Sequence, residues 1–167
     1  GDNNTALGHA AGSAINSGER NVAIGAQAGD ALTTGSSNVA VGMRALTTED
    51  TGGRNVAIGD NALEALNYDG HGHNTAVGYN AGLATTSGIN NTIVGGLAGG
   101  AMQDDSNNTA VGTQSMSSLQ TDNCVAVGFA SMFAATTSTR TTAVGPSAMG
   151  AGVVTGDDNT AIGSKSQ

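Results

Sequence analysis

The residues with the clearest chemical potential gather in one short stretch that ends at His73. It contains Tyr68, Asp69, His71 and His73, and so holds two of the three histidines and one of the two tyrosines. Two histidines separated by one residue can point the same way and, with an aspartate, bind a metal ion. The same side chains can instead contact a receptor or a glycan, or form a solvated loop. We expect these four residues to bind a partner and no metal ion to reside here. His71 and His73 are the candidate ligands under the alternative in which a metal ion binds.

Elsewhere the reactive side chains do not form a catalytic pattern. No serine, histidine and aspartate cluster as a nucleophile with its base. The glycine-rich run 95–100 follows the internal repeat described below rather than a strand that leads into a nucleotide-binding helix. Cys124 is the single cysteine, so no disulfide forms within the chain. We therefore expect that the protein is not an enzyme and uses no cofactor.

The composition is unlike that of an ordinary globular domain. Of 167 residues, 27 are glycine, none is tryptophan, two are phenylalanine and two are tyrosine. Side chains that bury much apolar surface are therefore scarce. The net charge is −8 and the five basic residues are scattered, which excludes nucleic acid and anionic membrane surfaces as partners. No apolar run approaches about 18 residues, so we expect no direct membrane insertion by this segment.

The elements that must position these side chains come from an internal repeat. A pentapeptide that ends in glycine recurs ten times, and its glycines fall at 8, 25, 42, 59, 78, 95, 112, 128, 145 and 163. The steps between them are therefore 17, 17, 17, 19, 17, 17, 16, 17 and 18 residues. So steady a period is typical of a solenoid. The 19-residue step contains the loop with His71 and His73, and insertions in solenoids emerge as surface loops that carry binding.

Each pentapeptide has the pattern of a short strand. In Val22–Gly25, Val22 and Ile24 share one face while Ala23 and Gly25 share the other, so neither face is polar. The fold class predicted is all-β, a parallel β-roll or β-solenoid of about ten 17-residue coils. Three residues past each glycine lies Ala or Ser, and we expect a short second strand there before the turn. Residues 1–167 form a single repeat domain, which we expect to be a fragment of a longer fibre.

The two strand faces predict an oligomer. The Ala and Gly face suits a narrow coil interior, whereas the Val and Ile face needs a second apolar surface, which the same face of other chains can supply. We expect a homotrimer, intertwined or side by side, with an axial column of one aliphatic residue per coil: Leu7, Ile24, Val41, Ile58, Val77, Val94, Val111, Val127, Val144 and Ile162.

An asparagine opens eight of the ten pentapeptides. Identical amides stacked one coil above another can form a hydrogen-bonded ladder, and this structural interpretation is preferred to ligand binding. Cys124 occupies the same column, which indicates a buried, inert thiol. The predicted ladder consists of Asn4, Asn21, Asn38, Asn55, Asn74, Asn91, Asn108 and Asn159.

Residues 21–28 resemble the head repeats of trimeric autotransporter adhesins, and residues 74–82 are similar to the repetitive shafts of phage tail fibres. The resemblance extends over residues 4–163. It implies a left-handed parallel β-roll, three chains about one axis, and attachment to a surface. The period here is longer than in the familiar adhesin heads, and no neck, coiled-coil stalk or anchor is present in the sequence. The implied location is the cell surface, through an outer-membrane anchor outside this segment, or a virion tail fibre.

Two functions follow from these features. One is an adhesive or receptor-binding fibre whose partners are a cell-surface receptor, a glycan or a matrix protein. The other is a purely structural shaft or spacer. A third alternative, an ice-binding solenoid, needs an unbroken threonine array, but the column that contains Thr5 is interrupted by Val22, Val39, Val56 and Val125.

Overall fold

In the computed structural model, the described residues are 1–118, 120–134, 138–150 and 156–166. They form ten short strands in a single sheet, in which every strand pairs in parallel with the strands of the coils before and after it. Within those ranges, no helix is long and apolar enough to span a lipid bilayer. The strands are Thr5–Leu7 (β1), Val22–Ile24 (β2), Val39–Val41 (β3), Val56–Ile58 (β4), Thr75–Val77 (β5), Thr92–Val94 (β6), Thr109–Val111 (β7), Val125–Val127 (β8), Thr142–Val144 (β9) and Thr160–Ile162 (β10).

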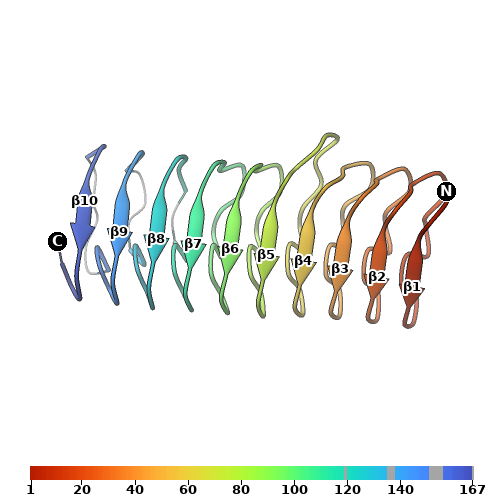
Figure 1. Ribbon diagram of the computed structural model, residues 1–167, viewed down its shortest axis with the longest axis horizontal. Coiled ribbons are helices and arrows are strands. Elements are labelled where there is room, and N and C mark those ends of the chain that lie inside the picture. The colour runs from red at the N-terminus through yellow and green to blue at the C-terminus, as the bar shows by residue number, and fades with distance from the viewer. Residues whose placement is uncertain (119, 135–137, 151–155, 167) are drawn as a thin grey trace.

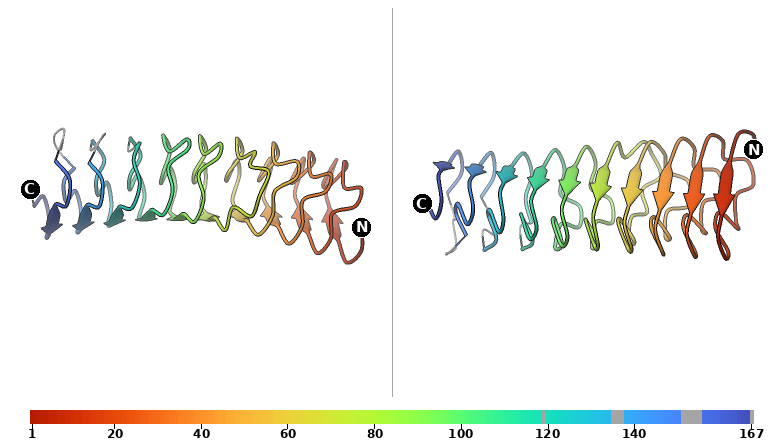
Figure 2. Two further views of the ribbon diagram at one scale, coloured as in Figure 1. Left: turned by 90° about the horizontal axis from the view of Figure 1, so that it is seen from above. Right: turned by 60° about the horizontal axis from the view of Figure 1, so that its bottom comes forward.

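The predicted parallel β-solenoid is confirmed, with about nine turns between the first and the last strand. The coils stack into a rod with the chain ends at opposite tips (Figure 1). The strands line one side of the rod and the connecting turns form the other side (Figure 2). Successive strands keep one register, so that Ala23 pairs with Ala40 just as Ala40 pairs with Ala57.

The glycine that closes each pentapeptide is required by the stacking. Gly25 has φ 127°, a conformation that side chains of L-residues rarely adopt. A Cβ on Gly25 would lie 2.5 Å from the carbonyl oxygen of Gly42 in the next coil. The N–H of Gly25 also donates to the carbonyl of Leu7 in the preceding coil, at 2.8 Å. Glycine therefore ends the strand and permits the closest approach between coils.

The predicted second strand is wrong, because the residues after the glycine form turns. In the second coil, Gln27 and Gly29 have φ of 57° and 52°, on either side of the buried Ala28. Left-handed residues at alternate positions bend the chain sharply, which an extended strand does not do. The coils still bond to one another here, since the Gly29 N–H donates to the carbonyl of Ala45 at 2.9 Å.

The interior of the rod is filled by small side chains from the strand and by one or two larger ones from the turn. Ala23 and Ala28 are fully buried, as is Leu32 on the opposite limb of the coil. Gly29 leaves the space that Leu32 occupies, because a Cβ on Gly29 would lie 2.8 Å from the Leu32 Cδ1. This complementarity replaces the aromatic core of a globular domain.

The other face of the sheet is uncovered. In β2 the central Ala23 is buried, while Val22 and Ile24 are only half-buried. The ten residues predicted as the axial column all lie on this outward face and all remain partly or largely exposed. Ile58, inside the stack, is 38% exposed, and Leu7 on the terminal strand β1 is 68% exposed. The column is therefore not part of the core of a single chain.

Candidate functional site

The insertion in the coil between β4 and β5 projects from the rod. In Figure 1 the connection between these two strands rises above the corners of the neighbouring coils. Its tip is fastened to the preceding coil by two backbone bonds of 3.0 Å, from the Gly53 N–H to the Gly70 carbonyl and from the Gly72 N–H to the Gly53 carbonyl. Gly53 and His71 also form an isolated parallel bridge. The insertion is thus a fastened loop, with a defined place for each side chain.

Tyr68 and Asp69 make contacts that fasten this loop to the rod. Tyr68 is half-buried and packs against the core cluster, so its ring holds the base of the loop. Asp69 is exposed, and its Oδ1 accepts a hydrogen bond of 2.9 Å from the hydroxyl of Thr51 in the preceding coil. Both residues were predicted to bind a partner, and these contacts fix the position of each within the loop.

His71 and His73 lie on the exposed side of the loop. Their rings meet edge to face, with centroids 5.9 Å apart. The Nε2 of His73 is 3.4 Å from Nη1 of Arg54 in the preceding coil. In the part of the chain that the structure describes, no three His, Cys, Asp or Glu side chains come together to hold a metal. The pair with Asp69 is therefore not assembled as a metal centre.

A buried glutamate compensates for the insertion. Glu49 is fully buried at the turn position where the neighbouring coils carry Leu32 and Leu66. Its Oε1 accepts from the Gly52 N–H at 2.7 Å and its Oε2 from the Tyr68 N–H at 3.3 Å. Burial raises the pKa of Glu49, while these N–H donors oppose the rise.

The need for this acceptor follows from the regular coils. There, the N–H that corresponds to Gly52 donates to a carbonyl of the next coil, as Gly35 does to Asp50 at 3.2 Å. The two extra residues after Asn67 lead the chain away from that position. The Glu49 carboxylate supplies the missing acceptor, because a buried N–H without a partner is costly. Glu49 supports the loop, and sequence reasoning missed it.

The residues directly before the pentapeptides form a column along one edge of the rod, here named the corner column. All have a left-handed backbone, with φ between 51° and 63°, and most carry exposed side chains. Several bond to the next member of the column, as Asn90 does to Asn107 at 3.2 Å. The corner column consists of Asn3, Arg20, Ser37, Arg54, His73, Asn90, Asn107, Asn123, Arg140 and Asp158.

The asparagine column forms a ladder, but its bonds lead mainly to the backbone and not from amide to amide. The Oδ1 of Asn21 accepts from the Asn38 N–H at 2.9 Å, and the Nδ2 of Asn38 donates to the Gly52 carbonyl at 2.9 Å. The same pair of bonds recurs in most coils. Six ladder residues are no more than 1% exposed: Asn21, Asn38, Asn55, Asn74, Asn91 and Asn108.

The ladder is interrupted at three places, of which one is Thr141, whose buried hydroxyl donates to the Thr139 carbonyl at 3.2 Å. Asn55 Nδ2 is buried without a hydrogen-bond partner, because the next coil is the one that carries the insertion. At Cys124 the thiol replaces the amide, and its Sγ lies 3.2 Å from the carbonyl of Ser138. Burial raises the pKa of the Cys124 thiol, in agreement with a thiol held in the core.

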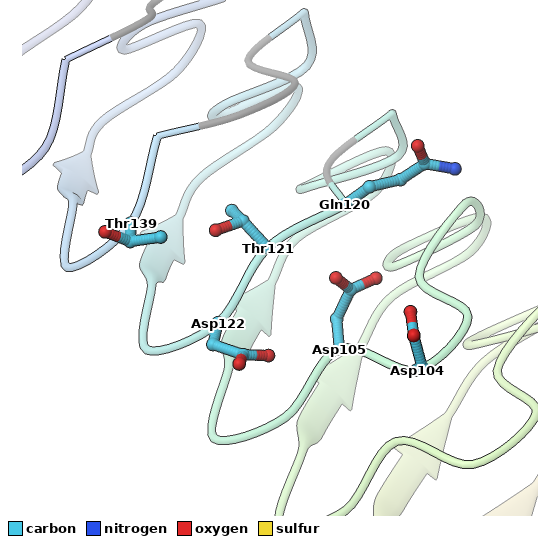
Figure 3. Close-up of a pocket in the computed structure, with 6 residues that line it drawn as sticks. All are labelled: Asp104, Asp105, Gln120, Thr121, Asp122 and Thr139. Atoms are coloured by element: carbon cyan, nitrogen blue, oxygen red, sulfur yellow. The ribbon is translucent and has the colours of Figure 1, made fainter.

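One further concavity is polar. A cavity of about 290 Å³ lies where the coil with the 16-residue step meets its neighbours, and its side chains come from successive coils (Figure 3). Burial raises the pKa of Asp105, and the charges of Asp104 and Asp122 raise it further. No residue predicted from the sequence lies in it. The cavity is lined by Asp104, Asp105, Gln120, Thr121, Asp122 and Thr139.

The fold and the ladder define the class of the protein, a parallel β-solenoid with one sheet face uncovered. Searches against protein-family models, curated proteins and solved structures return no match to this chain. Its function must therefore be inferred from its own geometry.

Proposed function

We propose that this chain is a rigid segment of an extracellular or virion-borne attachment fibre, wound as a left-handed homotrimer. The observation that carries the proposal is the uncovered face of the ten-stranded sheet, on which an aliphatic side chain stays half-buried or exposed in every coil. The repeat supplies reach and stiffness, and the projecting loop after β4 supplies a place for recognition.

The energetics favour covering this face. Complete burial of one Val or Ile side chain stabilises by about 1.5–3 kcal/mol relative to full exposure. Side chains such as Ile24 and Val41 are already half-buried, so each has roughly half of that left to gain. Summed over ten coils, the gain is large enough to oppose the entropy lost when three chains associate. A second and third copy fit because every copy presents the same column at the same spacing.

The first test of the proposal is the absolute mass of the protein by light scattering behind a sizing column. We expect about three times the chain mass of 16.1 kDa. A monomer at all concentrations would contradict the trimer. It would favour a single-chain solenoid, and ice binding by the exposed sheet face would then be measured by thermal hysteresis.

A charged substitution on the sheet tests whether this face forms the contact between chains. Ile58→Asp brings like charges together near the proposed axis, and we expect it to abolish assembly. Ser37→Asp is the matched control, because it adds the same charge at the corner column, where Asp158 already stands in another coil. Assembly of Ile58→Asp at the parental mass, or loss of assembly in Ser37→Asp, would place the interface elsewhere.

The second candidate function is a purely structural shaft. It requires the same trimeric assembly as the attachment fibre. The loops in most coils are short and similar, which suits a spacer, whereas the loop with His71 and His73 suits recognition. Binding to cell-surface glycans separates the two, since a pure shaft binds none.

A further inference from the structure

Arg54 differs from the other arginines of the rod. Among the described residues, no carboxylate lies within ion-pair distance of its guanidinium, and its side-chain neighbour is the Nε2 of His73 at 3.4 Å. The other three arginines form ion pairs: Arg20 with Glu19, Arg44 with Glu64, and Arg140 with Asp157 and Asp158. Arg54 therefore presents a positive charge that the chain itself does not neutralise.

The nearby carboxylates are engaged elsewhere. Glu49 is fully buried beneath the loop, where it accepts from backbone N–H groups. Asp69 accepts from the Thr51 hydroxyl at 2.9 Å. The net charge of the chain is −8, so an arginine free of carboxylates is an exception on this surface.

The side chains around Arg54 are hydrogen-bonding groups on an exposed projection. His73 follows Arg54 in the corner column, and the ring of His71 lies 5.9 Å from that of His73. A guanidinium has five N–H donors in a planar fork, and the contact with His73 uses one of its nitrogens. Arg54 can thus bind a planar anion with its remaining donors, while the imidazoles form hydrogen bonds with hydroxyl groups of the same ligand.

We propose that Arg54, His71 and His73 bind a glycan that ends in a carboxylate-bearing sugar, a site that rests on the attachment function proposed above. The carboxylate matches the arginine fork in shape and charge. A long polyanion is disfavoured because the rest of the acidic rod repels it.

The test uses a trisaccharide that ends in N-acetylneuraminic acid, with lactose as its neutral counterpart. Binding to the whole chain is followed by saturation-transfer NMR and calorimetry. We expect the acidic trisaccharide to bind and lactose not to bind. Arg54→Ser introduces the residue that Ser37 has in the same column, and we expect it to weaken binding about tenfold or more through loss of a charge-assisted pair.

The matched control is Arg20→Ser, which removes an arginine from the same column where Glu19 already neutralises it. We expect it to bind as the parent does. His73→Asn introduces the residue that Asn90 has in the same column, and we expect it to weaken binding about threefold through loss of one hydrogen bond. Equal binding of both sugars, equal loss in Arg20→Ser, preferred binding of a heparin fragment, or no binding would each overturn the site.

These outcomes are separate from the test of the fibre. A trimeric mass without sugar binding removes the site and leaves the fibre as a shaft. A monomeric mass with selective sugar binding retains the site and removes the trimer. Circular dichroism of each variant identifies any loss of binding that comes from misfolding.

Discussion

Truncation of two neighbouring ladder residues tests what the ladder contributes. Asn38 and Asn55 are equally buried, at 0% and 1% exposure, and substitution by alanine removes the same atoms from each. Asn38 makes both ladder bonds, through Nδ2 to the Gly52 carbonyl at 2.9 Å and through Oδ1 from the Asn55 N–H at 3.0 Å. Asn55 accepts from the Asn74 N–H at 3.1 Å, but its Nδ2 has no acceptor. Asn55 Oδ1 also accepts from Nδ2 of Asn74 at 3.3 Å, and that Nδ2 keeps its bond to the Gly88 carbonyl at 2.8 Å. The two variants therefore differ mainly in the amide-to-carbonyl bond, which Asn38 makes and Asn55 lacks.

The expected magnitudes follow from that difference. A buried polar group that loses its partner costs about 1–3 kcal/mol. Asn38→Ala leaves the Asn55 N–H unpaired and removes a donor from the Gly52 carbonyl, so we expect about 2–6 kcal/mol of destabilisation. Asn55→Ala leaves the Asn74 N–H unpaired but also removes an unsatisfied donor, and these effects offset each other, so its net cost should be about 4 kcal/mol smaller than that of Asn38→Ala.

The assay is guanidinium unfolding followed by circular dichroism, at one protein concentration because association shifts apparent stability. The free energies of unfolding of the parent, Asn38→Ala and Asn55→Ala are compared. The comparison requires that the dependence of this free energy on guanidinium concentration has the same slope in all three. If Asn55→Ala destabilises as much as Asn38→Ala, the amide-to-carbonyl bond contributes nothing. The ladder would then stabilise the rod only through Oδ1.

Two further predictions concern other buried polar groups. Burial raises the pKa of Glu49 above its ordinary value of 4.5, so its contribution to stability is full below about pH 4.5 and is lost as the pH rises through the folded-state pKa. The free energy of unfolding is measured for the parent and for Glu49→Gln at about pH 4 and about pH 7, and we expect the parent to lose stability relative to the variant at the higher pH. If the difference between the two proteins is the same at both pH values, Glu49 does not titrate in this range. Cys124→Asn should restore the amide bond to the Ser138 carbonyl and stabilise by about 1 kcal/mol in guanidinium unfolding, whereas a loss would show that the thiol packs better there.

The sheet was predictable because the pattern that specifies it repeats. The constant step of the pentapeptide, with Ala23 flanked by Val22 and Ile24, indicates a parallel strand in every coil and an inward alanine. A single coil would be ambiguous, since three residues are too few for a reliable period. Ten in-register copies remove that ambiguity, because each strand can pair only with its own equivalent in the next coil.

The turn after the glycine was missed because it is marked only by residue types that do not occur there. No Val, Ile or Thr stands two or four residues past the closing glycine in any coil, where Gln27 and Gly29 stand in the second. Those positions adopt a left-handed backbone, which β-branched residues avoid. A short buried Ala between such positions looks like strand alternation in the sequence. The backbone conformation is what distinguishes them, and glycine marks it in only some coils.

The loop after β4 could be located from the sequence but not its supports. The 19-residue step reveals that extra residues are present, and His71 and His73 are conspicuous among them. Arg54 belongs to the preceding coil, so its place beside His73 follows only from the stacking register. A site on a solenoid is built across coils, and residues one period apart in sequence are neighbours in space.

Glu49 shows how an irregular coil is accommodated by a regular stack. Two extra residues in one coil remove a carbonyl acceptor from the coil before it, and the replacement must come from a side chain that reaches the same N–H. A leucine, which the adjacent coils have at this position, would fill the space but leave the Gly52 and Tyr68 N–H groups unpaired. The insertion and the buried carboxylate thus form one structural unit. A charged residue in a column of otherwise uncharged buried side chains, one period before a lengthened coil, is the signal by which such a unit can be found in a repeat sequence.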